Sequence, residues 1–402
     1  MHGGTAATLI AKRKKQMVAS LLDHLCQQIE VTETQYQSAT SRYEAVGTWL
    51  AESTFPQLTR AKIYPQGSIA LGTAIKPIGH NEFDVDLVCH FPDLPATSNA
   101  LEVKMLIGNR LKEHGTYRGM LEEKKRCWRI NYANEFHLDI TPSISNPQCA
   151  QGGELVPDKL LAQWKPTNPK GYIAKFEQYA TIQPRFYLAE AALDKAFAEA
   201  DIAPLPDQTE YKPLLKRIIQ LLKRHRDHMF VGKTREEFAP ISVIISTLAG
   251  WAYAKCATRQ VHADAFDLIS AIIKEMPSFI KVEIRSGQRF YIVENETTAG
   301  ENFADKWNSD ERFAATFFEW HKDALESVES LLSVEGVDNF SESLSKSFGA
   351  NREQVRDTVA SMINPISNAR ISGRLIVNPK LGLVTTPALG SVYVPKNTFF
   401  GR

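Results

Sequence analysis

Two carboxylates that lie two residues apart are the clearest indication of chemistry in this chain. Asp84 and Asp86 alternate with apolar residues in the run Phe83–Leu87. In a β-strand, residues i and i+2 share a face, so the two carboxylates would stand side by side while the apolar side chains face the core. Neighbouring carboxylates repel each other unless a cation lies between them. Magnesium prefers such oxygen ligands, and this spacing therefore predicts a metal site.

A third carboxylate follows in a second alternating run. In Phe136–Ile140 the apolar side chains would face the core and Asp139 the site. Pro142 is expected to end this strand, because proline cannot donate to a β-ladder. Cys127–Tyr132 is predicted to be the partner strand of a hairpin, with its turn at residues 134–135. Three carboxylates on adjacent strands are the arrangement that a two-metal site requires, with ions about 3.5–4 Å apart.

A turn of small residues, Gly67-Ser68, precedes the first carboxylate pair. Glycine lets a backbone approach a ligand closely, and Ser68 could cap the helix that follows. The N–H groups at a helix N-terminus bind anions, and Lys76 could add positive charge. Taken alone, a Gly-Ser turn or an Asp-x-Asp strand is more often an ordinary solvated feature. Their order and spacing together favour a catalytic site that holds phosphates and metal.

A cluster of basic residues lies farther along, in the predicted helix Lys212–His228. Lys223 could bind phosphate there. The alternative is a solvated basic stripe opposite an apolar face, with His225 and His228 at the surface. Ser242 presents a similar choice, because serine often caps a helix and can also contact a phosphate.

These motifs, in this order, resemble the DNA polymerase β-like nucleotidyltransferases. The chain is most similar to the bacterial cGAS/DncV-like nucleotidyltransferases, or CD-NTases, which make cyclic oligonucleotide signals in CBASS anti-phage defence. The segments that carry the resemblance are Pro65–Ala74, Phe83–Val88, Leu222–Asp227, Pro240–Ala249 and Val394–Gly401.

The resemblance implies an α+β fold in which a polymerase β-like sheet lobe and a helical lobe form a bilobed cage. It implies catalytic, metal-binding carboxylates, namely Asp84, Asp86 and Asp139, holding two Mg²⁺ ions, with Mn²⁺ as an alternative. It also implies residues that bind the phosphates of the nucleotide, namely Gly67, Ser68, Lys223 and Ser242.

The activity that the resemblance implies is synthesis of a cyclic oligonucleotide from ATP and GTP, with release of pyrophosphate. A cyclic GMP–AMP-type product is expected. Two alternatives stay open: a linear oligoadenylate or RNA-end nucleotidyltransferase, and a non-catalytic nucleotide-binding scaffold. Expected partners are an effector that senses the product and a ubiquitin-transferase-like protein at the C-terminus, although the terminal Arg402 departs from the small residue usual in relatives.

Composition sets broader limits. The chain has 402 residues, a formal charge of +1 and five cysteines without paired spacing. Near-neutral charge argues against a strong nucleic-acid binder, and scattered cysteines are typical of reduced thiols. The sequence shows neither a secretion signal nor a membrane-length apolar run. A cytoplasmic location is therefore expected.

Three parts are predicted along the chain: N-terminal helices and the catalytic core in 1–165, a mainly helical lobe in 166–363, and an extended tail in 364–402. A turn-rich hinge is expected at Gln163–Tyr172, and a hairpin at 279–293. The predicted helices are Thr8–Ala51, with a second start at Thr32, then Leu101–Glu113, Ala189–Ala200, Lys212–His228, Pro240–Ala257, Ala263–Lys274, Ser309–Leu332 and Arg352–Met362.

Overall fold

The computed structural model describes residues 3–79, 83–133, 135–158, 160–187, 212–363, 376–378, 382–384 and 392–393. The chain divides into two units, Cys26–Glu326 and a smaller one of Met1–Leu25 with Ser327–Arg402. The predicted boundaries at 165 and 363 stay a prediction. Within the described residues, no helix is long and apolar enough to span a membrane. All five cysteines are free thiols.

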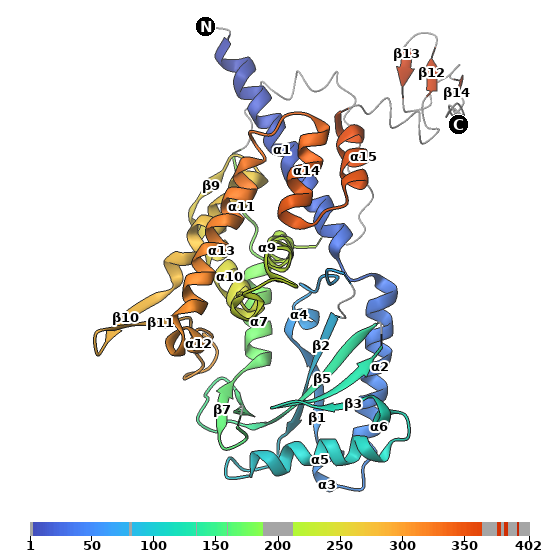
Figure 1. Ribbon diagram of the computed structural model, residues 1–402, viewed down its shortest axis with the longest axis vertical. Coiled ribbons are helices and arrows are strands. Elements are labelled where there is room, and N and C mark those ends of the chain that lie inside the picture. The colour runs from blue at the N-terminus through green and yellow to red at the C-terminus, as the bar shows by residue number, and fades with distance from the viewer. Residues whose placement is uncertain are drawn as a thin grey trace. The chain divides into compact units, whose positions relative to one another are not determined.

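A seven-stranded mixed sheet forms the first half of the larger unit (Figure 1). Five strands follow one another across it in the order β1-β2-β5-β4-β3, and β6 and β7 extend it from β5. β2 and β5 are parallel, and the other neighbours are antiparallel. The strands are β1 Lys62–Gln66, β2 Phe83–Phe91, β3 Leu121–Glu123, β4 Trp128–Tyr132, β5 Phe136–Ser145, β6 Glu154–Pro157 and β7 Trp164–Thr167.

One face of this sheet packs on two helices, α2 (Glu33–Ala51) and α5 (Ala100–Glu113). Apolar side chains of β2 such as Val85 and Leu87 join those helices in one buried core. The predicted helix start at Thr32 is confirmed, since Thr32 and Gln35 form a capping box. The Asn99 side chain caps α5 by accepting hydrogen bonds from the N–H groups of Leu101 and Glu102. Apolar and polar residues alternate along β2 and β5 because only one face of the sheet is buried in this core.

β5 is longer than the sequence predicts. The strand was expected to end at Pro142, but it continues to Ser145. Its pairing with β4 stops at Ile140, and its pairing with β6 begins at Ile144. Pro142 therefore lies where that side of the strand has no partner in the ladder. A gap of this kind in a ladder tolerates proline, which has no N–H to donate.

The turn-rich segment Gln163–Tyr172 contains regular structure, and its role as a hinge stays a prediction. These residues form β7 and the start of α7 (Pro169–Ala180). The Asn168 side chain accepts a hydrogen bond from the Gly171 N–H, and Pro169 occupies the first turn. Asparagine before proline is a helix-start signal, and the turn formers at this point mark the beginning of a helix.

The rest of the larger unit is mainly helical (Figure 1), as predicted, so the α+β expectation is confirmed. Its principal helices are α9 Leu214–Phe230, α10 Ser242–Arg259, α11 Ala265–Glu275 and α13 Glu311–Ser330. Each agrees with a predicted helix to within a few residues, whereas the predicted helix Ala189–Ala200 lies outside the described residues.

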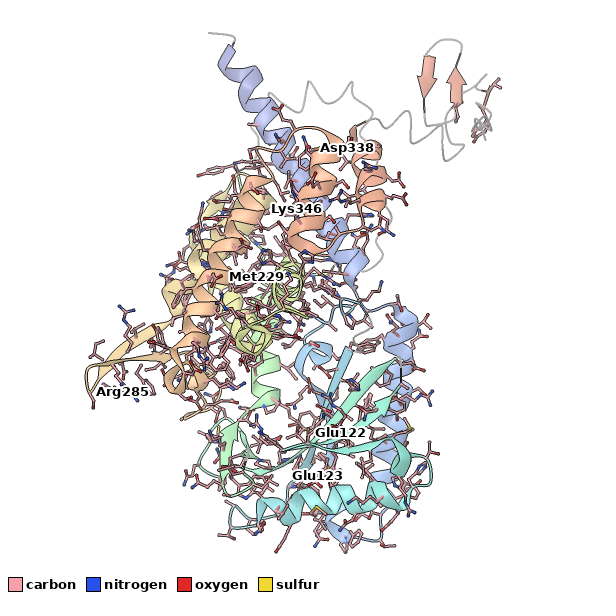
Figure 2. The ribbon with its side chains drawn as sticks, in the orientation of Figure 1. Glu122, Glu123, Met229, Arg285, Asp338 and Lys346 are labelled. Atoms are coloured by element: carbon pink, nitrogen blue, oxygen red, sulfur yellow. The ribbon has the colours of Figure 1, made fainter. Side chains whose placement is uncertain are left out.

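The predicted hairpin is present as β10 (Lys281–Arg285) and β11 (Gln288–Ile292). Ser286 and Gly287 both have positive φ, which suits a two-residue turn. Figure 2 shows Arg285 at the projecting end of this hairpin. The shorter elements of the larger unit are α3 Pro56–Thr59, α4 Gly67–Ala70, α6 Tyr117–Met120, β8 Arg185–Phe186, η1 Glu236–Phe238, β9 Val261–His262, η2 Met276–Phe279 and α12 Asp305–Ser309.

The smaller unit contains two helices from the C-terminal part of the chain, α14 (Val337–Phe348) and α15 (Arg352–Ile363). The long N-terminal helix α1 (Gly3–Ile29) begins in this unit. In the predicted tail, the described residues form three short antiparallel strands in the order β13-β12-β14. These strands are β12 Ile376–Asn378, β13 Gly382–Val384 and β14 Val392–Tyr393.

A tightly packed glycine in α5 yields a stability prediction. A Cβ on Gly108 would lie 2.2 Å from the indole of Trp128, which is buried and donates to the Lys104 carbonyl at 2.9 Å. Overpacking a core costs about 1–3 kcal/mol, so Gly108→Ala is expected to lower the melting temperature by several degrees in thermal unfolding. Gly119→Ala is the matched control, because a Cβ there meets no atom within 4 Å. Equal melting temperatures for both variants would contradict the prediction.

Candidate active site

The three predicted carboxylates share the face of the sheet opposite the core. Asp86 and Asp139 are direct partners in the parallel pairing of β2 and β5. Asp84 lies two residues before Asp86 on the same face, and 57% of its side chain is exposed. The structure therefore brings together on one surface the residues that the alternating patterns predict.

Arg129, on β4, holds these carboxylates in the structure. It lies opposite Asp139 in the antiparallel pairing. Its guanidinium donates to both Asp139 oxygens, at 2.6 and 2.8 Å, and to Asp84 Oδ1 at 3.2 Å. Sequence analysis missed this residue. The signal was present, because Arg129 alternates with Trp128 and Ile130 in the predicted partner strand and so had to share the face of Asp139.

The carboxylates are electrostatically crowded. Burial, together with the charges of Asp84 and Asp139, raises the pKa of Asp86 to about 7. Burial also raises the pKa of Asp84; Arg129 opposes this change and Asp139 adds to it. A negative charge on one of these carboxylates disfavours ionisation of its neighbours. A cation close to Asp86 would relieve that repulsion.

Gly67 lies directly against Asp86. Its φ is +65°, and a Cβ at this position would lie 2.5 Å from Asp86 Oδ2. Glycine is the residue that adopts this conformation without strain. The four-residue helix α4 begins at Gly67 without a side-chain cap, so the expectation that Ser68 caps this helix is wrong. The missing Cβ is what allows the Asp86 carboxylate to lie against this turn.

Lys223 connects helix α9 to this turn. Its Nζ is buried and donates to the Thr73 carbonyl at 2.9 Å, while the Thr73 N–H donates to the Ser68 carbonyl. The pKa of Lys223 is lowered to about 7, mainly by burial and then by the positive charge of Arg226, while the charges of Asp227 and Asp86 oppose this change. The lysine is therefore close enough to interact electrostatically with the carboxylate site. Lys76 is directed elsewhere, since its Nζ donates to the Gln28 carbonyl.

The alternative of a solvated basic stripe on α9 is wrong for three neighbouring residues. Lys223, Arg224 and His225 are each less than 7% exposed. His225 was expected at the surface, but its Nε2 lies 3.3 Å from Asp323 of α13. Cations in this part of the helix face protein because α9 is packed on several sides, which a helical periodicity alone does not reveal.

Ser242 is the first residue of α10 and does not cap it, because Ile241 holds the cap position. Its hydroxyl accepts a hydrogen bond from Arg226 at 3.0 Å. Arg226 also donates to the Pro240 carbonyl, and its charge lowers the pKa of Lys223. Lys223 and Ser242 are thus linked through Arg226, and a phosphate role for both stays a prediction.

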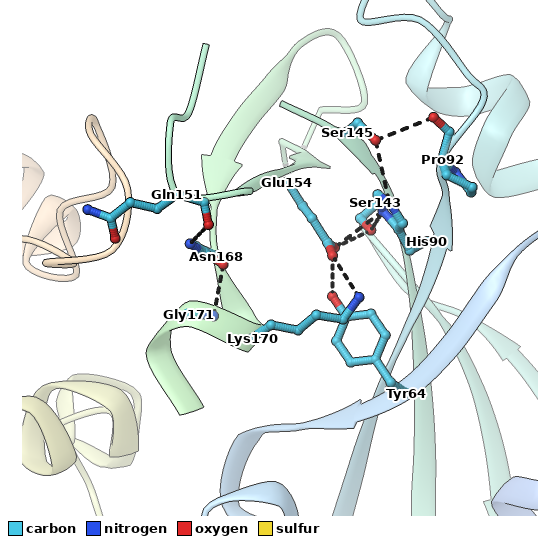
Figure 3. A network of polar contacts seen from close by, with 10 residues as sticks. All are labelled: Tyr64, His90, Pro92, Ser143, Ser145, Gln151, Glu154, Asn168, Lys170 and Gly171. Carbon is cyan, nitrogen blue, oxygen red and sulfur yellow. Dashed lines mark hydrogen bonds and ion pairs between the residues drawn. The ribbon is translucent and has the colours of Figure 1, made fainter. Parts of the chain in front are cut away.

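Farther along the same sheet face lies a network that sequence analysis did not identify (Figure 3). The buried Glu154 of β6 accepts hydrogen bonds from Tyr64 and Ser143, both at 2.6 Å. Lys170 of α7 lies 3.6 Å from the same carboxylate and over the Tyr64 ring. Burial, and then the contact with Glu154, raises the pKa of Tyr64 well above its usual range. Through Tyr64, the network attaches β1 to β6. The Gly67-Ser68 turn follows directly after β1.

The donor set suits a hard divalent cation. Carboxylate oxygens are the ligands that Mg²⁺ prefers. The described residues contain no group of three or more His, Cys, Asp or Glu side chains that could already hold an ion. Arg129 provides the neutralising cation instead, so an arriving metal would have to compete with its guanidinium for Asp139 and Asp84.

The buried Lys223 yields a second prediction. Removing its charge in Lys223→Met is expected to raise the melting temperature at pH 6, below the folded-state pKa of about 7. The gain should shrink as pH rises from 7 towards 10.5, because only the unfolded wild-type chain then binds this proton. The predicted contact of Lys223 with a phosphate implies that nucleotide affinity should also fall about tenfold in this variant. Thermal unfolding and calorimetry measure both effects. Lys322→Met, at an exposed position, is the control; an equal gain in both variants would contradict the argument.

Parts of the chain are similar to known proteins. Residues 17–179 match the model of the Second Messenger Oligonucleotide or Dinucleotide Synthetase (SMODS) domain. A c-di-GMP synthase of Roseivirga ehrenbergii is 29% identical over 306 residues, covering 74% of this chain and 75% of the relative. The cyclic dinucleotide synthase CdnG of Bradyrhizobium diazoefficiens is 30% identical over 253 residues, covering 58% of each chain.

Solved structures share the fold. Bradyrhizobium diazoefficiens CdnG in complex with GTP aligns with a TM-score of 0.63 at 22% identity, over 86% of this chain and 98% of that one. CdnC of E. coli MS115-1 with ATP aligns with a TM-score of 0.58 at 10% identity, over 83% and 97%. These likenesses confirm the predicted polymerase β-like fold class. The domain match and the curated relatives identify the chain as a nucleotidyltransferase that is similar to the CD-NTases.

Proposed function

We propose that the protein is a cyclic dinucleotide synthase that uses GTP as at least one of its substrates. The observation that carries this proposal is the placement of Asp86 opposite Asp139 in the β2–β5 pairing, with Gly67 against Asp86. The named activities of the two curated relatives support the cyclic product. No described feature favours the linear-product or scaffold alternatives.

The residues have distinct proposed roles. Asp84, Asp86 and Asp139 would hold two Mg²⁺ ions, which when bound supply charge neutralisation and lower the pKa of an attacking hydroxyl. The Gly67-Ser68 turn would hold the donor triphosphate from one side. Lys223 and Ser242 would contact its phosphates from the helical side. The protein thereby aligns a ribose hydroxyl with the α-phosphorus, and chemistry of this kind depends mainly on positioning and charge.

Two products are compatible with this proposal, and they differ in the bases that are joined. The sequence resemblance implies a cyclic GMP–AMP-type product, while the name of the Roseivirga relative favours cyclic di-GMP. Both contain guanosine. Incubating purified protein with Mg²⁺ and labelled ATP and GTP, separately and together, distinguishes the two. A product from GTP alone would be cyclic di-GMP, and a product that requires both would be the mixed ring.

Mass spectrometry after phosphatase treatment completes the test. A cyclic product has no terminal phosphate and resists the enzyme, whereas a linear one is shortened. Pyrophosphate release without a resistant product would overturn the cyclic proposal and favour the linear alternative. Nucleotide binding without pyrophosphate release would favour the scaffold.

The proposal extends to a biological setting. A role in CBASS anti-phage signalling, in the cytoplasm and with a product-sensing effector, follows from the family. A regulatory partner is also proposed, since E. coli CdnC has been solved in a complex with HORMA. The C-terminal residues 399–402, where a ubiquitin-transferase-like partner is predicted to act, lie outside the described residues. Removing them and measuring conjugation in cells tests that part.

A further inference from the structure

A large cavity lies in the larger unit away from the carboxylates. Its volume is about 1220 Å³, and its walls come from the loop after β5, from β7, α7 and α10, and from the segment 279–300. None of the seven predicted site residues lines it. Pockets that bury small molecules measure about 300–1,000 Å³, so the cavity can hold a drug-sized ligand.

Aromatic side chains from separate elements face this cavity: Trp164, Tyr179, Trp251 and Phe279. The Trp251 and Phe279 rings lie 5.9 Å apart. Both indole N–H groups already have protein acceptors, since Trp164 donates to the Ser98 carbonyl at 2.7 Å and Trp251 to Glu296 at 2.7 Å. The Trp164 and Trp251 rings are half-buried at the cavity wall, where a planar ligand could stack on them.

A carboxylate is held in place beside these rings. Tyr179 and Trp251 both donate to Oε2 of Glu296, at 2.6 and 2.7 Å. Because the two donors share one oxygen, Oε1 can accept a hydrogen bond from a ligand. Glu296 is exposed and lines the cavity. A fixed carboxylate next to aromatic faces is complementary to a ring that carries N–H or amino donors.

The charge of the lining argues against phosphate. Among the described lining residues, Lys281 is the one Lys or Arg, and its Nζ lies 3.6 Å from Glu294. The two glutamates outnumber it. The several negative charges of a triphosphate would find no unpaired cation among these lining residues.

We propose that this cavity binds a planar nitrogen heterocycle with amino or ring N–H donors and without phosphate, such as a purine nucleoside. The ring stacks among Trp164, Trp251 and Phe279, and its donor edge meets Glu296. This site is separate from the one that takes the nucleoside triphosphate, and its existence does not depend on the product of the enzyme.

The probe for this site is 2-aminopurine riboside, whose fluorescence is quenched when the base stacks. Titration with the full chain is expected to give saturable quenching that excess Mg²⁺-GTP does not displace. Affinity should fall about tenfold in Trp251→Ala through lost stacking. Glu296→Gln keeps the side-chain shape and should weaken binding about tenfold through the lost charged acceptor. Tyr36→Ala, an exposed aromatic on α2 outside the cavity, should bind like wild type.

Three results would overturn the proposal. They are the absence of saturable quenching at millimolar probe, quenching that both cavity variants leave unchanged, and displacement of the probe by Mg²⁺-GTP. Circular dichroism of each variant shows whether it is folded. If Trp251→Ala unfolds, the Glu296→Gln titration decides the outcome alone.

Discussion

Asp139→Asn is expected to reduce synthesis by about 10³-fold, the scale of losing a group that stabilises transition-state charge. The substitution keeps the size of the side chain but removes the negative charge that Arg129 binds at 2.6 and 2.8 Å. That charge is also what a metal ion would require. The measurement is initial-rate pyrophosphate release from GTP and ATP with Mg²⁺.

Asp93→Asn is the matched control, because Asp93 is exposed and follows the other end of β2. It should keep the wild-type rate. The Asp139→Asn protein should keep a wild-type circular dichroism spectrum, since the core lies on the opposite face of the sheet. Near-normal turnover by a folded Asp139→Asn protein would remove this residue from the catalytic site.

Gly67→Ala is expected to lower turnover by about 10²-fold, as displacing catalytic groups by about 1 Å can do. The new Cβ would lie 2.5 Å from Asp86 Oδ2, so either the carboxylate or the turn must move. Positive φ adds strain of its own. The kinetic measurement is the rate of product formation at saturating nucleotide, where a displaced carboxylate reduces kcat.

The control for backbone strain is Gly232→Ala. Gly232 has φ +70°, close to the +65° of Gly67, but a Cβ there meets no atom within 4 Å. Both variants therefore carry similar conformational strain, and Gly67→Ala alone crowds Asp86. If the two lose equal activity, strain and not the carboxylate contact would explain the effect.

Much of the catalytic face could be predicted from the sequence, because one-sided burial leaves a period-two pattern. Asp84, Asp86 and Asp139 alternate with core residues, and the structure places all three on one face. The β4–β5 hairpin was also predicted, and its register places Arg129 opposite Asp139. The parallel pairing of β2 with β5 could not be read in the same way, because these strands are far apart in the sequence.

The helical half was predicted well in outline and less well in its surfaces. Amphipathic periodicity located α9, yet Lys223 and His225 are buried where a polar stripe was expected. Burial on a second face depends on what packs there, such as the Thr73 carbonyl that receives Lys223. The cavity at Trp251 could not be predicted from the sequence either, because the residues that line it come from distant segments of the chain.

The ion pairs of Arg129 also predict how the protein behaves without metal. A guanidinium that already neutralises Asp139 and Asp84 replaces the ion as a structural counter-charge. The fold should then be indifferent to chelators: EDTA is expected to stop synthesis without shifting the melting temperature. Metal-stripped protein could be stored in active form and started at a chosen moment by adding Mg²⁺, which makes rapid-mixing experiments on the first bond-forming step practicable.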